Sequence, residues 1–213
     1  FHDNNYPREF IENFIIPIGA AIWSTVPSNM LNIPAVFFIR FFNNHGLLQI
    51  LNRPKWWVIK GGSYQYVKKI IVDFKKRIRL STPVQSIKRN KKSVLIRYGS
   101  QNQEEVFDAV VLATHSNQAL QLLEDPSEKE IEILTLLPYQ RNDAVLHFDE
   151  SILPKRKLAW SSWNYLLDKN KEDPVALTYN MNILQGLNSS KTFCVTLNSS
   201  EMIDESKIIK NLS

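Results

Sequence analysis

Cysteine and glycine are scarce in this chain of 213 residues, and long apolar runs are absent. The single cysteine, Cys194, excludes an internal disulfide and a cysteine-cluster metal site, and it favours a reducing, cytoplasmic location. The longest apolar runs, such as Ala35–Ile39, are far shorter than the ~20 residues that a membrane-spanning helix needs. Because 44% of the residues are hydrophobic and 22% are charged, we expect a soluble globular protein.

Sequence motifs that indicate a particular catalytic or nucleotide-binding chemistry are also absent. Only Gly61 and Gly62 are adjacent among six glycines, so the sequence holds neither a GxGxxG turn nor a Walker loop to bind a pyrophosphate. The four histidines are widely spaced, HExxH and GxSxG are absent, and no metal site or catalytic residue is assigned. The chain opens on Phe1 without a methionine, and we expect it to be a portion of a longer polypeptide.

Positive charge is concentrated in one segment. Arg53–Arg97 contains fourteen basic residues and a single acidic one, Asp73. Such a segment can attract an anionic membrane surface, nucleic acid or a phosphate-bearing partner. The simpler interpretation is a solvated helix face followed by a hairpin tip. Nucleic acid is not an expected partner, because no zinc finger or other nucleic-acid motif accompanies the charge.

The first third of the chain has helical periodicity. Apolar residues recur at the helical interval over residues 7–22, where Pro17 should kink or divide the helix. Pro34 begins a second helix that Gly46 ends, and this helix is apolar nearly all round, so we expect it to be buried or to line an apolar cavity. Trp56–Ile59 has the pattern of a short strand.

The middle of the chain changes to strand periodicity. The expected strands are Ile78–Leu80, Val84–Arg89, Val94–Tyr98 and Glu105–Ala113. The last of these ends in VVLA, which is typical of a strand buried on both faces. Thr114 or Ser116 is expected to cap a helix that runs to Leu123, and Ser127 with Glu130 forms a capping box for the next helix.

Four further strands are expected after Pro138, and they are Asn142–Phe148, Lys157–Tyr165, Val175–Asn182 and Thr192–Asn198, with a helix-like segment at the C-terminus. No crossover helix is long enough to join them in parallel, so the sheet should be antiparallel. The chain is therefore predicted to be α+β. Its expected divisions are a helical part (1–76), a β-meander with a strand and helix (77–126) and an antiparallel sheet with a helix (127–213).

Three aromatic residues near the second of these strands are candidates for a ligand-binding wall. A regular strand would send Trp160 and Trp163 to opposite faces and would place Tyr165 on the face of Trp163. One tryptophan can then pack in the core while the other lines a substrate cavity. Ordinary core packing is the alternative for all three residues.

Several segments, in order, resemble the middle portion of flavin-containing amine oxidase-like proteins, in particular a bacterial branch described as predicted NAD/FAD-binding oxidoreductases. The segments that carry the resemblance are Ile16–Leu31, Phe41–Leu48, Arg53–Val67, Phe107–Pro126 and Leu158–Leu167. The resemblance implies a substrate domain together with the β-meander of an FAD-binding domain. The N-terminal GxGxxG unit and the C-terminal FAD segment would belong to missing parts of the same polypeptide.

The resemblance also implies where FAD would lie. In the family, the residue after a TP pair presents its backbone to the adenine, which corresponds to Val84 in TPVQSI. The strand end at Ala113 and Thr114 would approach the dinucleotide. Trp160, Trp163 and Tyr165 would bind a small apolar or amine substrate. The resemblance predicts an FAD-dependent oxidoreductase whose present portion is inactive alone.

One departure leaves the substrate open. Many amine oxidases hold a lysine near the flavin, but the corresponding strand reads RNDAVLHF, where Asn142, Asp143 or His147 could substitute. One alternative is a flavoenzyme that acts on a lipid or polyene while peripheral to an anionic membrane. Another is a non-enzymatic module that binds acidic partners through its basic face.

Overall fold

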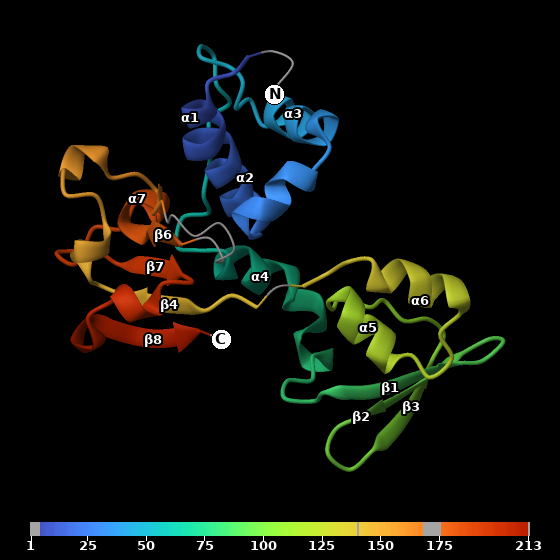
Figure 1. Ribbon diagram of the computed structural model, residues 1–213. Helices are drawn as coiled ribbons and strands as arrows, with labels where there is room; N and C mark the ends of the chain where they lie inside the picture. The colour runs from blue at the N-terminus through green and yellow to red at the C-terminus, as the bar shows by residue number, and fades with distance from the viewer. Residues whose placement is uncertain (1–4, 140, 168–175, 213) are drawn as a thin grey trace. The chain divides into compact units, whose positions relative to one another are not determined.

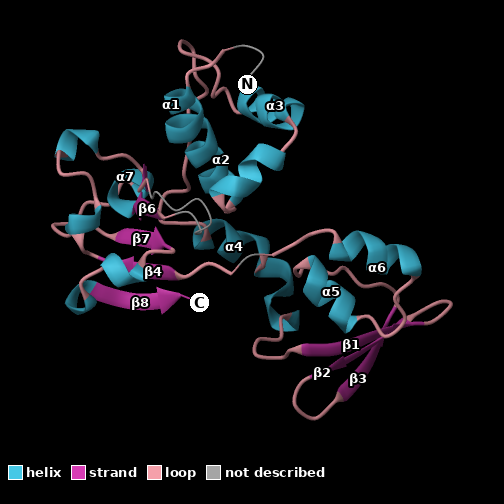
Figure 2. Ribbon diagram, in the orientation of Figure 1, coloured by secondary structure: helices cyan, strands magenta, loops and turns pink. Residues whose placement is uncertain are grey.

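The computed structural model describes residues 5–139, 141–167 and 176–212. The chain forms two compact units. Unit 1 combines Phe1–Lys69 with Gln140–Ser213, and unit 2 is the intervening Ile70–Tyr139. Figures 1 and 2 show helices together with two antiparallel sheets, which confirms the predicted α+β class.

The helical part of unit 1 comprises α1 (Arg8–Phe10), a π-helical turn (Ile11–Ile15), α2 (Ile16–Trp23), a 3-10 helix (Pro27–Asn32), α3 (Ala35–Asn44) and α4 (Tyr64–Ile70). The helix was predicted to kink or divide at Pro17; the backbone stays helical through this region, and Pro17 lies in the first turn of α2, directly after the π-helical turn. Proline lacks a backbone N–H, and a wider turn before it accommodates the lost hydrogen bond. Trp56–Ile59 forms no strand, contrary to the prediction.

The core of unit 1 lies between these helices and one strand of its sheet. Ile16, Ala20, Met30, Phe38 and Phe42 are buried together with Leu177 of that strand. Helix α3, which was expected to be buried or to line an apolar cavity, is buried on one face only, because Val36, Phe37 and Ile39 are more than half exposed. Only the face that carries Phe38 and Phe42 reaches the core.

The sheet of unit 1 has five strands in the order β5-β6-β7-β4-β8, all antiparallel. Their bounds are β4 (Ala144–His147), β5 (Trp163–Tyr165), β6 (Leu177–Asn180), β7 (Cys194–Leu197) and β8 (Ile208–Leu212), and α7 (Met181–Gln185) follows β6. The C-terminal segment is thus an edge strand rather than the predicted helix. Its five residues are too few for their pattern to distinguish a strand from a helix, and pairing with β4 makes the segment a strand.

The strand predicted over Lys157–Tyr165 is mostly absent. Lys157–Ala159 is a 3-10 turn, and the strand begins only at Trp163. The prediction that Trp160 and Trp163 point to opposite faces of one strand therefore fails, because Trp160 lies outside the strand. Val175, the expected start of the next strand, lies outside the described residues. Asn180, expected within that strand, instead ends β6 and caps α7 through its side chain, which accepts from the Ile183 N–H at 3.2 Å.

Unit 2 is a three-stranded meander, β1 (Val84–Arg89), β2 (Val94–Tyr98) and β3 (Gln103–Phe107), followed by α5 (Ser116–Leu122) and α6 (Glu128–Thr135). Both helices lie on one side of the sheet (Figure 1). The register pairs Ile87 with Ile96 and Leu95 with Val106, so these pairs lie on opposite faces of the sheet. Ile87 is 1% exposed and is the centre of the covered face.

Two strand predictions in unit 2 are wrong. Ile78–Leu80 has no regular structure, and the strand predicted over Glu105–Ala113 ends at Phe107. Val111 is 90% exposed, so the VVLA run is not buried on both faces. A buried strand needs a neighbour on each edge to receive its backbone groups, and no described segment pairs with residues 109–113.

Candidate functional site

A cavity of about 470 Å³ lies between the meander and α5 in unit 2. Val84, Ala113 and Thr114, which the resemblance predicted to contact FAD, all line this one cavity. They come from two segments separated by more than twenty residues of meander. The sequence predicted each residue separately, and the tertiary structure brings the three to one place. Their role in binding stays a prediction.

The chemistry of the lining suits a flat heterocycle. The walls are mainly aliphatic, with Ile87, Ile96 and Leu122 among them, and the polar side chains are Thr114, Gln118 and Gln121. No carboxylate lines the cavity. Among the described residues, no hydrogen bond engages the backbone of residues 109–113. These free N–H and C=O groups can bind the edge of a base.

The N-terminus of α5 is held by contacts from the end of α6 and from Tyr139, which follows that helix. His115 is the N-cap residue, not Thr114 or Ser116 as predicted, and its N–H donates to Gln118 Oε1 at 3.3 Å. Ser116 donates its N–H to the Tyr139 hydroxyl at 2.7 Å and its own hydroxyl to the Leu134 carbonyl at 2.9 Å. The hydrogen bond from Ser116 lowers the pKa of Tyr139. These contacts fix the first turn of α5, directly after Thr114 of the cavity lining.

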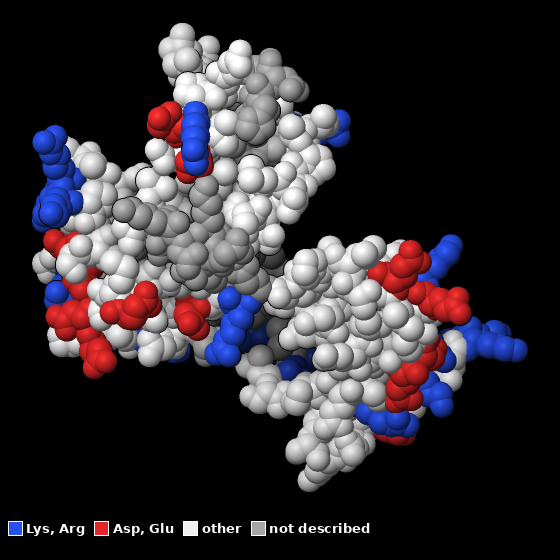
Figure 3. Space-filling view, in the orientation of Figure 1, with Lys and Arg blue, Asp and Glu red and all other residues white. Residues whose placement is uncertain are grey.

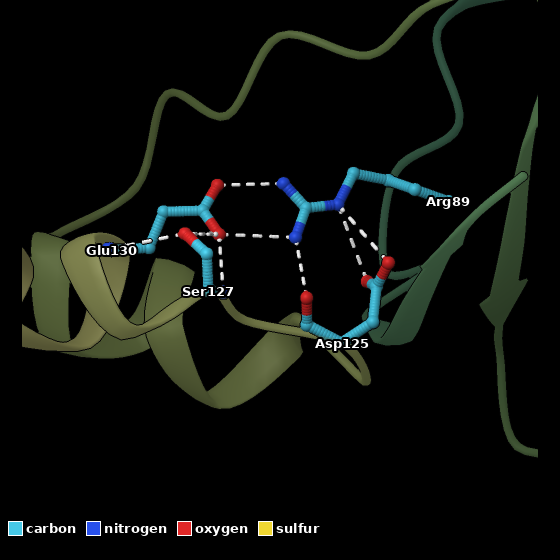
Figure 4. A network of polar contacts seen from close by, with 4 residues as sticks. All are labelled: Arg89, Asp125, Ser127 and Glu130. Carbon is cyan, nitrogen blue, oxygen red and sulfur yellow. Dashed lines mark hydrogen bonds and ion pairs between the residues drawn. The ribbon is translucent and has the colours of Figure 1, made fainter. Parts of the chain in front are cut away.

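The far end of α5 is held by a charged network (Figure 4). The Arg89 guanidinium, at the end of β1, binds the Glu130 carboxylate at 2.6 and 3.0 Å and the Asp125 carboxylate at 3.3 Å. Ser127 and Glu130 form the predicted capping box. The hydrogen bond from Arg89 is the main reason that the pKa of Glu130 falls to about 2.

A second cavity in unit 2 was not predicted. It measures about 530 Å³ and shares Val84 and Ile96 with the first. Its lining includes three cations, Lys76, Arg77 and Arg79, together with Tyr98 and Phe107. Its one carboxylate, Glu105, is already engaged with Arg79 at 2.6 Å and with the Tyr98 hydroxyl at 3.0 Å. The basic run in the sequence was the signal, but folding alone shows that these cations border the predicted adenine contact.

The aromatic residues predicted to bind substrate are only partly brought together. Trp163 and Tyr165 line a cavity of about 500 Å³ in unit 1, along with Leu153 and Met202. Trp160 does not line it: its indole N–H donates to the Pro154 carbonyl at 2.7 Å, and Lys157 lies over its ring at 5.0 Å. Trp163 also packs edge-on against Tyr179 at 5.3 Å.

Asn142 and Asp143, proposed as substitutes for the family lysine, lie immediately before β4, and His147 ends that strand. His147 is fully buried. Its Nδ1 accepts the Asp149 N–H at 3.0 Å, and its Nε2 lies 2.7 Å from the Thr196 hydroxyl, which in turn bonds Thr178 at 2.8 Å. Burial lowers the pKa of His147. These contacts make it a structural residue of the sheet.

Asp149 stands beside this histidine and is 1% exposed. Its carboxylate accepts from the Ser151 and Asp204 N–H groups and from Lys207 Nζ, each at 3.0 Å. These hydrogen bonds hold its pKa well below the usual range against the opposing effect of burial. Sequence reasoning missed this network, because its members are distant in the chain.

Cys194 lies opposite His147 in β7 and is completely buried. Burial raises the pKa of its thiol to about 11, so it stays protonated and acts as a packing residue. Within residues 5–139, 141–167 and 176–212, no helix is long and apolar enough to cross a membrane. The same ranges hold no group of three or more His, Cys, Asp or Glu side chains placed to bind a metal ion.

Comparison with known proteins agrees with the segments that pointed to a flavin protein. The family of flavin-containing amine oxidoreductases matches the chain over residues 1–182. The chain belongs to this family, and FAD is its expected cofactor. No curated protein matches the chain closely enough to be counted as a relative.

Proposed function

We propose that this chain is part of an amine oxidase-like, FAD-dependent oxidoreductase and that it forms the adenine side of the flavin site. One observation carries the proposal: Val84, Ala113 and Thr114 line a single cavity beside a backbone segment without hydrogen-bond partners among the described residues. Membership of the family supports flavin dependence. When bound, the flavin would supply the hydride chemistry of such an enzyme.

The residues present fit an adenosine moiety. The cavity of about 470 Å³ lies within the usual range for small-molecule sites, roughly 300–1,000 Å³. Aliphatic side chains would cover the faces of the base, while the free backbone groups near Ala113 would bind its edge. The neighbouring cations, Lys76 and Arg77, would balance phosphate charge.

The pyrophosphate-binding turn is not part of this sequence, which contains no GxGxxG. We propose that flanking parts of the same polypeptide supply this turn and the remaining flavin contacts. Residues 1–213 alone would then be inactive. The free thiol Cys194 is consistent with a cytoplasmic location, which remains part of this proposal.

For the substrate, we propose the cavity lined by Trp163 and Tyr165. Its mixed lining, with Asn164 and Ser161 beside the aromatic rings, suits a small apolar or amine compound. Trp160 has a supporting role, since its hydrogen bond to Pro154 fixes the loop that forms one wall.

The flavin site is tested by filling it. In the complete gene product, Ala113→Trp should displace adenosine and weaken FAD binding by more than tenfold, measured as visible flavin absorbance retained after gel filtration. Val106→Trp is the matched control, because Val106 is 63% exposed on the opposite face of the meander. A colourless complete product that ignores added FAD, or an Ala113→Trp variant that binds normally, would overturn the proposal. The first result would favour a non-enzymatic binding module.

A further inference from the structure

The segment between α3 and α4 combines exposed apolar side chains with basic ones. We call residues 46–60 the tryptophan loop. Trp56 and Trp57 are 72% and 79% exposed. The other apolar residues of the loop that are at least 46% exposed are Leu48, Ile50, Leu51, Val58 and Ile59. Monomeric soluble proteins rarely leave so many large apolar side chains together in water, and such patches commonly mark an interaction surface.

The loop has a defined shape. Gly46 adopts a left-handed backbone, and Pro54 packs so closely on it that an added Cβ would lie 2.3 Å from the proline ring. Arg53 donates to the Gln49 carbonyl, and the His45 ring, stacked on Phe41 at 4.0 Å, extends toward Trp56 at 6.4 Å. The tryptophans are therefore presented from an anchored turn at the end of α3.

The charge in the loop and in the sequence on either side of it has one sign. No aspartate or glutamate occurs anywhere in residues 13–72, whereas six basic residues do, and they are Arg40, Arg53, Lys55, Lys60, Lys68 and Lys69. Lys55 Nζ lies 4.9 Å from the centre of the Trp57 ring. In Figure 3 the acidic side chains of unit 1 instead gather over its sheet and near α1.

We propose that the tryptophan loop docks unit 1 on an anionic phospholipid surface, with Trp56 and Trp57 inserted among the headgroups. Tryptophan prefers this interfacial depth, because its ring is largely apolar while its N–H stays hydrated. Lys55 and Lys60 would pair with lipid phosphates and carboxylates. Nucleic acid offers the same negative charge but no apolar layer to receive Leu51 and Val58. This inference does not depend on flavin binding.

The test uses the full chain and two sets of vesicles, phosphatidylcholine alone and phosphatidylcholine with about one third phosphatidylserine. Sedimentation should show binding to the anionic vesicles that weakens at high salt. Tryptophan fluorescence should shift to the blue and be quenched by brominated lipid. Both fluorescence changes should be lost in Trp56→Ser/Trp57→Ser. Because both side chains are exposed, this variant should fold normally.

The contribution of charge is tested by Lys55→Glu/Lys60→Glu. At about fivefold in binding for each basic residue near the surface, this change should weaken partitioning by more than tenfold. Lys91→Glu/Lys92→Glu is the matched control, since it makes the same charge change at the hairpin tip of unit 2 and should leave at least half of the binding. Equal loss in both variants, no quenching of the unaltered chain, or salt-sensitive binding to an RNA oligonucleotide without binding to vesicles would overturn the proposal.

Discussion

Among single residues, Ser127 shows how a capping box stabilises the start of a helix. Its hydroxyl accepts the N–H of Glu130 at 3.3 Å, while the Glu130 carboxylate accepts the N–H of Ser127 at 2.8 Å. Two donors that the first turn of α6 cannot satisfy internally are thereby paired. The same carboxylate also accepts a hydrogen bond from the Arg89 guanidinium, and this links the end of β1 to α6.

Ser127→Ala should lower the free energy of unfolding of unit 2 by about 1 kcal/mol, because one N-terminal N–H loses its acceptor. Thermal unfolding followed by circular dichroism measures the change. Ser127→Asp should retain most of the stability, since aspartate is an equally good N-cap. Equal losses for the two substitutions would show that the cap has no part in stability.

His147 should make unit 1 sensitive to mild acid. Burial lowers its pKa below the usual 6.5, so the native state binds fewer protons than the unfolded state in this range. Stability is complete above pH 6.5 and falls as the pH drops toward the folded pKa, by at most about 1.4 kcal/mol per pH unit. Protonation of Nδ1 would also remove the acceptor of the Asp149 N–H.

Urea unfolding at a series of pH values measures this dependence. His147→Gln removes the titrating group while keeping an amide that can form hydrogen bonds, and it should flatten the profile below about pH 6.5. An unchanged profile in this variant would assign the sensitivity to another group.

Among the helices and turns, the turn after α3 depends on a glycine for two reasons. Gly46 has a φ of +64° and also has Pro54 in the space where a side chain would begin. Gly186, which ends α7, has the same φ but no heavy atom within 4 Å of the position that a Cβ would take. The pair therefore separates backbone strain from steric overlap.

Gly46→Ala should cost clearly more than Gly186→Ala. The second substitution should cost about 1 kcal/mol from the left-handed backbone alone. The first must also displace Pro54 and the tryptophan loop. Chemical denaturation of both variants measures the difference. If the two losses are equal, Pro54 yields without cost and does not anchor the loop.

Across the chain as a whole, the two units have separate buried cores. Leu177, 2% exposed, belongs to the cluster of unit 1, and Ile87, 1% exposed, is buried in unit 2. Substitutions in separate cores act independently when they share no contacts. A single melting temperature is then an incomplete description of this chain.

Ile87→Ala and Leu177→Ala should each cost roughly 3 kcal/mol, because a buried aliphatic side chain is removed and leaves a cavity. Ile87→Ala should lower the stability of unit 2, measured by hydrogen exchange of the meander, and leave the exchange of β6 and β7 unchanged. Leu177→Ala should have the reverse effect. If either substitution destabilises both units equally, the chain unfolds as one cooperative structure.

Local patterns were sufficient for much of the fold. The capping box at Ser127 and the hairpin of β1 and β2 each depend on neighbouring residues, and both are confirmed. Patterns failed where a distant partner determines the structure. The C-terminal segment became a strand by pairing with β4. Trp160 is a different case, because the 3-10 turn directly before it was not recognised in the sequence.

The order of residues was enough to establish the α+β class, the antiparallel pairing, the concentration of basic charge and the resemblance that family membership bears out. Folding in three dimensions was needed to establish that Val84, Ala113 and Thr114 share one cavity, that cations adjoin it, and that His147 is enclosed by Thr196 and Asp149. Caps and turns form between neighbours in the chain, so a short stretch of sequence specifies them. A cavity or a buried network needs side chains from segments whose meeting depends on the packing of the whole unit.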